Sequence, residues 1–193
     1  TKEAAQYVAS YGGTYLATTV TPHHLICDRR ALFDGGLNPH FFCLPVLKRT
    51  EDVQALRRLV AGGYAEVFAG TDTAPHPTHA KERACGCAGG CFVAPVALSM
   101  YAQVFEEENA LDSFEKFVST NGADWYGLPV NKERIKLVRY DEPDGPRALL
   151  ASAPLKEQSD RDAEHEFLRT AVRPFGMHTD PAKTLKWHWR VAV

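Results

Sequence analysis

The chain has 193 residues, a formal net charge of −2 and 45% hydrophobic residues. This length suits one domain or a piece of a larger one, and the composition allows a packed core rather than extensive disorder. The near-neutral charge argues against a nucleic-acid-binding surface, and no apolar run approaches the roughly 18 residues of a membrane span, so we expect neither kind of partner.

The first third of the chain alternates predicted helices with predicted strands. Hydrophobic spacing, helix-capping residues and glycine or proline breaks define each element. The alternation predicts the α/β class, with a parallel sheet and helices packed outside it. In chain order the expected elements are a helix at 2–10, a strand at 15–20, irregular structure at 21–49, a helix from an N-cap at Thr50 to Gly62-Gly63, and a strand at 65–69.

The rest of the chain is expected to be mostly helical until its last residues. The C-terminal "LKWHWRV" alternates apolar with polar residues, which is typical of a strand with one buried face. The expected elements are a helix at 95–107, a helix at 111–118 that Asn121-Gly122 can cap, a turn or linker at 141–146, a solvated helix at 156–170, and a strand over Leu185, Trp187, Trp189 and Val191.

Two parallel strands are too few for the sheet that this pattern predicts. A parallel sheet with both faces covered needs more strands than the two at 15–20 and 65–69. We therefore interpret the chain as the later part of a larger α/β domain.

Five cysteines bear on the compartment and on metal binding. An odd count in a chain of this length does not predict a disulfide framework, so we expect a reducing, cytoplasmic compartment. Three of the cysteines, Cys85, Cys87 and Cys91, stand in "CGCAGGC". Structural zinc sites usually have four ligands at wider spacing, so we favour a tight glycine-rich loop with small apolar fillers over a zinc or redox site.

Asp72 is the first candidate for chemistry, because it lies three residues beyond the predicted strand at 65–69. Sites in parallel α/β folds lie where strands end, and a carboxylate there can bind a metal or shuttle a proton. His76 and His79 follow in a proline-containing loop and could bind a metal or an anionic substrate. The alternatives are an aspartate that starts a turn and two solvent-facing histidines.

Two further stretches lie near the expected strand ends. "TPHH" (21–24) closes the first predicted strand, so His23 and His24 are candidate ligands, although a packed histidine is the commoner case at such a position. "NPHFFCLPVLKR" (38–49) has no charged side chain before Lys48, which predicts a packed loop with backbone groups available for contacts.

Seven stretches, taken together and in this order, carry a family resemblance. They are "TPHHL", "NPHFFCLPVLKR", "GTDTAPHPTHAKE", "CGCAGGCF", the Ala-Pro-x-Ala at 94–97, "VFEEENAL" and "NGADWYGLPVN". Together they closely resemble the bacterial-type, single-enzyme dihydroorotases of the amidohydrolase superfamily. The resemblance extends from residue 1 to about 138, is weak from 141 to 182, and returns in the final "KTLKWHWRV".

The resemblance implies a fold and an activity. The family has a (β/α)8 barrel with a two-zinc centre and interconverts N-carbamoyl-L-aspartate and L-dihydroorotate in pyrimidine biosynthesis. This chain would be the C-terminal portion of the barrel, with Tyr15–Val20 as strand seven and Ala65–Ala69 as strand eight. Residues 1–140 would belong to the barrel, and residues 141–193 would form a variable extension of the same domain that ends in a strand. The other zinc ligands, including a carboxylated lysine, would lie upstream, in the N-terminal part of the same barrel or in a separate chain. The family is usually dimeric.

The resemblance also implies roles for four residues. Asp72 would be a zinc ligand and the proton shuttle. His76 would contact the substrate carboxylate, and backbone groups of Leu44 and Ala88 would hold the substrate. Two other interpretations stay open: a non-catalytic fragment or partner-dependent subunit, and another cyclic amidase, against which "CLP" and "CGCA" argue. The chain alone is expected to be inactive.

Overall fold

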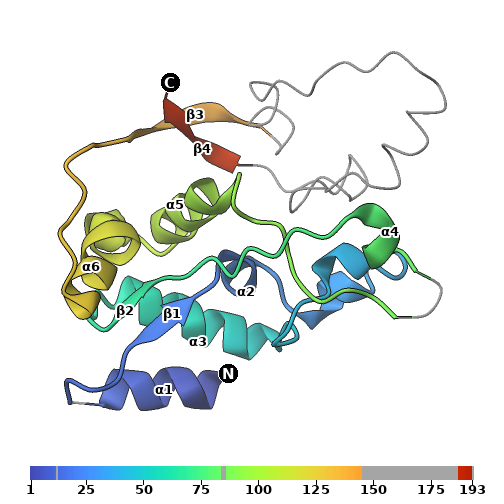
Figure 1. The fold of residues 1–193 in the computed structure, drawn as a ribbon, viewed down its shortest axis with the longest axis horizontal. Coiled ribbons are helices and arrows are strands. Elements are labelled where there is room, and N and C mark those ends of the chain that lie inside the picture. Colours follow the sequence, from blue (N-terminus) through green and yellow to red (C-terminus); the bar gives the residue numbers. More distant parts are fainter. Residues whose placement is uncertain (12, 84–85, 145–186, 193) are drawn as a thin grey trace.

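A short parallel sheet lies at the centre of the computed structural model, which describes residues 1–11, 13–83, 86–144 and 187–192. Strand β1 (Thr18–Val20) pairs in parallel with β2 (Val67–Ala69), so that Thr18 faces Val67 and Val20 faces Ala69 (Figure 1). The predicted parallel pairing is confirmed. Both strands are shorter than predicted, because the ladder between them extends over three residue pairs.

Two helices pack side by side on one side of this sheet. They are α1 (Lys2–Ser10) and α3 (Thr50–Ala61), both close to their predicted bounds (Figure 1). The predicted N-cap at Thr50 is wrong, because the Thr50 hydroxyl donates to Asp28 Oδ2 at 2.6 Å. The buried Asp52 carboxylate instead accepts the backbone N–H groups of Arg49 at 3.0 Å and Lys2 at 2.7 Å, which joins the first turns of the two helices.

Helix α5 (Ala97–Glu107) lies close to its predicted bounds of 95–107, and it contacts α3 and shares one buried core with it (Figure 1). The segment after it differs from the predicted single helix at 111–118. It consists of a 3₁₀ turn (Leu111–Ser113), a π-helix (Lys116–Thr120) and α6 (Asn121–Tyr126). Asn121 does not end a helix but begins one, because its side-chain amide is used elsewhere: it donates to the carbonyl oxygens of Tyr64 and Val67, each at 3.0 Å.

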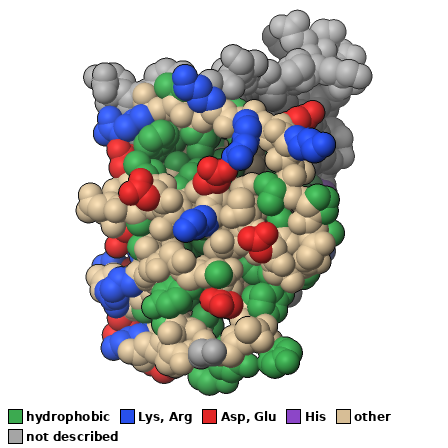
Figure 2. Space-filling model, turned by 90° about the vertical axis from the view of Figure 1, so that its left-hand side faces the viewer, with side chains coloured by type: hydrophobic (Ala, Val, Ile, Leu, Met, Phe, Trp, Pro, Cys, Tyr) green, Lys and Arg blue, Asp and Glu red, His purple; other side chains and the backbone are tan. Residues whose placement is uncertain are grey.

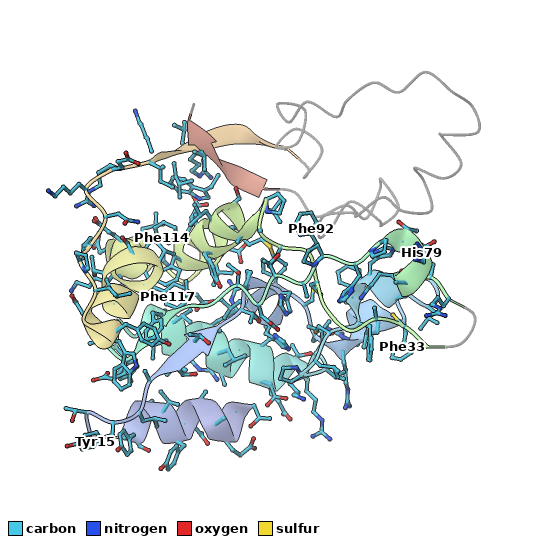
Figure 3. All side chains as sticks on the ribbon, in the orientation of Figure 1. Tyr15, Phe33, His79, Phe92, Phe114 and Phe117 are labelled. Carbon is cyan, nitrogen blue, oxygen red and sulfur yellow. The ribbon has the colours of Figure 1, made fainter. Side chains whose placement is uncertain are left out.

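The main core fills the space between the sheet and these helices. Phe117 packs edge-on against Tyr101, and Phe114 packs edge-on against Phe105, with ring centroids 5.2 and 5.6 Å apart (Figure 3). The buried members of this core are Ala5, Val20, Leu25, Ala55, Leu59, Val60, Val67, Ala97, Tyr101, Val104, Phe105 and Phe117. Their periodic spacing on α3 and α5 explains why those helices were predictable.

The stretch 21–49, predicted as irregular, contains short helical turns. They are α2 (Pro22–Ile26) and two 3₁₀ turns (Arg29–Leu32 and Pro39–Phe41), and a further short helix, α4 (Thr78–Lys81), follows β2. Pro22 and Pro39 each stand at the start of a helical turn, where a missing N–H costs nothing. A second buried cluster holds this region against the segment 91–100 and consists of Cys27, Leu32, Phe41, Cys43, Leu47, Cys91, Val93, Val96 and Met100.

Two antiparallel strands pack on α5 at the end of the described chain. They are β3 (Lys136–Asp144) and β4 (Trp187–Ala192), and their pairing confirms the C-terminal strand. The predicted turn at 141–146 is wrong over residues 141–144: these belong to β3, and Pro143 is accommodated where the register shifts between Arg139 and Asp144. Strand β3 also crosses the boundary drawn at residue 140. The helix predicted at 156–170 lies outside the described residues.

The predicted buried face of the last strand is confirmed in part, at one of the two positions whose side chains the structure describes. Trp189 is partly buried and donates from Nε1 to Glu106 Oε2 of α5 at 2.9 Å, but Val191, expected on the same buried face, is 43% exposed. Among the described residues, β4 packs mainly against α5. None of the helices in the described residues is long and apolar enough to cross a membrane.

Candidate active site

A depression of about 520 Å³ opens where β1 and β2 end. In parallel sheets the carboxyl ends of neighbouring strands meet at one edge, so the residues that follow them converge. Asp72 and Gly70 contribute from the end of β2, and His24 and Lys48 from the chain after β1. The remaining lining residues are Thr1, Thr19, Val20, Thr21, Pro45 and Leu56.

Asp72 has an unusual backbone conformation at this edge. Its φ angle is 45°, in the left-handed region that residues other than glycine adopt seldom, and often at turns or functional sites. The next residue holds it there: Thr73 Oγ1 accepts the backbone N–H groups of Val93 at 3.2 Å and Ala94 at 3.0 Å. The Asp72 side chain is exposed, and none of the described residues donates a hydrogen bond to its carboxylate.

Gly70 allows the turn after β2 to pass close to β1. A Cβ atom at this position would lie 2.5 Å from the Cβ atom of Thr19, a distance that real side chains do not tolerate. The glycine therefore lets the chain that carries Asp72 approach the first strand.

His76 is oriented by the glycine-rich loop. Its Nε2 lies 3.1 Å from the carbonyl oxygen of Gly89, and since a carbonyl can only accept, Nε2 carries the proton of this hydrogen bond. Gly90, with φ of 145°, comes so close that a Cβ atom there would lie 2.4 Å from the Cβ atom of Ala74. His79, the other predicted histidine, is exposed on α4 (Figure 3). His76, rather than His79, therefore lies against the backbone of the glycine-rich loop.

The predicted substrate residues Leu44 and Ala88 come from two loops that meet. A Cβ atom on Gly89, next to Ala88, would lie 3.2 Å from Cγ of Leu44, whose side chain is 65% exposed. The two residues differ in their backbone groups. The Ala88 N–H donates to the Ala80 carbonyl at 3.0 Å and the Ala88 carbonyl accepts from Lys81, whereas the Leu44 N–H has no partner among the described residues.

His24 lines the depression, but the protein already uses both of its ring nitrogens. Nδ1 lies 2.6 Å from the Thr21 hydroxyl, and Nε2 lies 3.0 Å from the Pro45 carbonyl oxygen. The Pro45 carbonyl requires a proton on Nε2, so Nδ1 accepts from the hydroxyl. The role that these contacts support is the fixing of the 38–49 loop against α2, rather than the metal binding considered for "TPHH".

The sequence analysis did not predict that His23, Cys43 and Cys91 cluster. All three are buried, and one potential ligand atom of each lies within 4.8 Å of the others, so they could hold a metal ion. The Cys91 side chain, helped by His23 and His24, lowers the pKa of the Cys43 thiol against the effect of burial. The same shared hydrogen bond and burial raise the pKa of Cys91.

The cluster differs from the trio considered in the sequence analysis. Cys87 lies apart and contacts the carbonyl oxygens of Pro39 and Ala88 through weak S–H···O hydrogen bonds at 3.5 and 3.6 Å, while Cys85 lies outside the described residues. No local spacing joins residues 23, 43 and 91, so only the folded chain reveals this group.

Asp72 offers one possible metal ligand at this edge of the sheet. The Asp72 carboxylate is exposed to the depression and carries no hydrogen bond from the described residues, so its oxygens are available to a cation. Zinc in catalytic sites takes about three protein ligands, more than one carboxylate supplies. The buried His23, Cys43 and Cys91 offer one nitrogen and two sulfur atoms, a donor set that zinc also accepts.

Comparisons with known proteins point to one kind of enzyme, although no protein-family model matches the chain. A dihydroorotase of Salmonella arizonae is 57% identical over 142 residues, and one of Salmonella newport is 56% identical over the same length. A solved dihydroorotase of Saccharomyces cerevisiae, in complex with 5-fluoroorotic acid, superposes with a TM-score of 0.71 at 26% identity. One of Campylobacter jejuni gives 0.68 at 28% identity.

The chain covers only a part of each of these proteins. The Salmonella matches include 74% of this chain but 40% of the relatives, and the two solved structures match 99% and 100% of this chain but 49% of theirs. The resemblance to dihydroorotases drawn from the sequence is confirmed, and the described α/β fold corresponds to about half of such an enzyme.

Proposed function

We propose that this chain is part of a dihydroorotase, a zinc-dependent enzyme that reversibly closes N-carbamoyl-L-aspartate to L-dihydroorotate in pyrimidine biosynthesis. The observation that carries this proposal is the 57% identity to a dihydroorotase over 142 residues, a stretch long enough to include the strand ends and both loops around the depression. Asp72, a candidate from its place after an apolar strand, lines that depression.

In this proposal β1 and β2 are strands seven and eight of a (β/α)8 barrel, and the remaining strands come from another part of the enzyme. Support comes from the incompleteness of the described sheet, because a two-stranded parallel sheet is not expected to be stable by itself. Residues 1–140 would belong to the barrel, and residues 141–193 to its C-terminal extension. The homodimer and the second barrel segment, in the same or a separate chain, are predictions.

Asp72 would act as both metal ligand and proton carrier. When bound, zinc supplies a water that is nucleophilic near neutral pH. Ring opening would add water across the ring amide bond, so that the carbonyl carbon gains an oxygen and the nitrogen departs. Asp72 would take a proton from the water and deliver it to the departing nitrogen, which then becomes the neutral NH₂ of the carbamoyl group. In ring closure the same carboxylate moves the proton back.

His76, Leu44 and Ala88 would hold the substrate. The His76 ring already donates from Nε2 to Gly89, so its other nitrogen, Nδ1, is the one that would face a substrate carboxylate, as a donor when the ring is protonated. The backbone N–H of Leu44 is a donor without a partner among the described residues. Ala88 could offer its carbonyl oxygen directly, whereas its N–H would first have to leave the Ala80 carbonyl.

A substrate comparison with the complete enzyme that contains this chain tests the proposal. We expect turnover of L-dihydroorotate and N-carbamoyl-L-aspartate, and turnover of hydantoin that is lower by several decades in kcat/KM. Efficient hydantoin hydrolysis with little action on dihydroorotate would identify another cyclic amidase. Absence of turnover with either substrate, with zinc bound, would identify a non-catalytic relative.

A further inference from the structure

The Lys81 side chain lies almost wholly inside the protein, beneath the glycine-rich loop. It is 3% exposed, and its ammonium group donates to three backbone carbonyl oxygens: Phe42 at 2.9 Å, Ala88 at 2.7 Å and Gly90 at 2.8 Å. An ammonium group has three N–H donors, so each is used once. Among the described residues no carboxylate pairs with Lys81, whose charge is balanced only by carbonyl dipoles.

Burial of this charge needs a physical reason. Lysines are rarely buried without a charged partner, since removal of an ammonium group from water costs several kcal/mol. Burial lowers the pKa of Lys81, and the surrounding cysteines partly oppose that change. An apolar side chain could fill the same space without the cost of burying a charge. What only the lysine provides is hydrogen bonds that fix the three carbonyl groups.

The three carbonyl groups belong to two different loops. Phe42 lies two residues before Leu44 in the 38–49 loop, while Ala88 and Gly90 lie in the glycine-rich loop. The Phe42 carbonyl also accepts the backbone N–H of Gly90 at 2.9 Å, so the loops touch directly as well. Lys81 is thus a common anchor that fixes the distance between the segment carrying Leu44 and the segment carrying Ala88.

We infer that Lys81 is a positioning residue that holds the two substrate loops at a fixed separation and thereby sets substrate affinity. The inference rests on the proposed function for the roles of Leu44 and Ala88, and it adds a residue that does not itself touch the substrate. Without the ammonium group the Ala88 and Gly90 carbonyls lose their donor, and the loops separate. Substrate binding, which needs groups from both loops, weakens more than the chemical step at Asp72.

The test compares Lys81→Met with a matched control, Asn121→Leu, in the complete enzyme. Asn121 is also buried and also donates to two backbone carbonyls, Tyr64 and Val67, but at the opposite end of β2. We expect Lys81→Met to raise KM about tenfold or more with a smaller change in kcat and unchanged zinc content. Asn121→Leu should lower thermal stability without raising KM.

Hydrogen exchange gives a second readout that does not depend on activity. Peptides from 38–49 and 86–91 should exchange faster in Lys81→Met, and peptides from α1 and α3 should not. If Lys81→Met does not fold, Lys81→Gln keeps two N–H donors and should show the same changes to a smaller degree. Unchanged KM together with unchanged loop exchange would overturn the inference. If the wild-type enzyme does not act on dihydroorotate, the proposed function fails, and loop exchange still decides whether Lys81 anchors the loops.

Discussion

At the scale of single residues, the Gly89 carbonyl fixes the direction of the His76 ring. Replacement of His76 by alanine should weaken the reaction while zinc content stays near wild type, because in the proposed function the histidine binds the substrate carboxylate rather than the metal. Loss of a charge-assisted hydrogen bond typically costs roughly 1.5 to 3 kcal/mol, or about one to two decades in kcat/KM. Steady-state kinetics and metal analysis on the same sample measure both quantities.

His79→Ala is the matched control, since His79 lies only three residues further on and is exposed on α4. It should leave kcat/KM within a few-fold of wild type. Loss of zinc from His76→Ala would make His76 a metal ligand and would contradict the assigned role.

The cysteines give a second residue-scale prediction. Cys27, Cys43, Cys87 and Cys91 are free thiols in the described structure, and burial raises the pKa of Cys27 to about 12. All five cysteines of the chain should therefore titrate as thiols after denaturation, and the buried ones should react slowly before it. Thiol titration without reductant, in native and denaturing buffer, measures this. A deficit that persists after complete zinc removal would reveal a disulfide.

At the scale of elements, the Asp52 carboxylate joins α1 to α3 through the backbone N–H groups of Lys2 and Arg49. These two hydrogen bonds, that from Lys2 first, lower the pKa of Asp52. A lowered carboxyl pKa gives stability that is present above the unfolded value of about 3.9 and is lost as the pH falls through the folded value. The joint between the helices should therefore weaken in acid.

Asp52→Ala tests this joint. At pH 7 it should reduce the free energy of unfolding by about 1 to 2 kcal/mol, as expected for a lost helix cap. Below pH 4 the gap between wild type and variant should narrow, because the wild-type carboxylate becomes protonated as well. Thermal unfolding of the complete enzyme at both pH values is the measurement. If the difference in stability between wild type and Asp52→Ala stayed constant in acid, the carboxylate would be ruled out as its cause.

The acidic run Glu106–Glu108 at the end of α5 is also explained at this scale by its contacts. Arg57 of α3 forms ion pairs with Glu107 and Glu108, each at 2.6 Å, and Glu106 contacts Arg139 of β3 and Trp189 of β4. The "EEE" of the family resemblance therefore joins α5 to three other elements, α3, β3 and β4, and stabilises the fold rather than the site.

Elements with local signals were predictable, and elements that depend on distant partners were not. Helices α1, α3 and α5 have apolar spacing that the core uses directly. By contrast, β3 contains a turn-like "DEPD" and forms because β4, more than 40 residues away, pairs with it. The capping error at Thr50 has the same origin, because Asp28 takes its hydroxyl.

The candidate site divides in the same way. Asp72 could be predicted from its place after an apolar run. The contacts of Lys81 could not be predicted, because folding alone brings residues 42, 88 and 90 to its ammonium group. The cluster of His23 with Cys43 and Cys91 could not be predicted for the same reason.

At the scale of the whole molecule, the described sheet has two unpaired edges and the surface keeps apolar side chains. Tyr15, at the end of the loop before β1, is 91% exposed, and Figure 2 shows apolar side chains in several places among the charged ones. Figure 3 shows Tyr15 at the periphery, away from the paired phenylalanines of the core. Neighbouring barrel strands would cover such edges.

Residues 1–193 alone should therefore bind no two-zinc centre, show no turnover and tend to aggregate, because the chain offers one of the expected metal ligands and open sheet edges. Size-exclusion chromatography, metal analysis and an activity assay on the purified chain test this. Stoichiometric zinc together with dihydroorotate hydrolysis by the chain alone would contradict it.

The most direct test of the account is Asp72→Asn in the complete enzyme, assayed in both directions with zinc measured on the same sample. Asparagine keeps the size and can offer an oxygen to a metal, but it cannot accept the proton and return it to the departing nitrogen. Positioned acid–base groups typically contribute about 10² to 10⁴-fold, so we expect at least such a loss in kcat for ring opening and ring closure, with a smaller change in substrate affinity. Turnover within a few-fold of wild type, with zinc retained, would remove Asp72 from the mechanism and contradict the account.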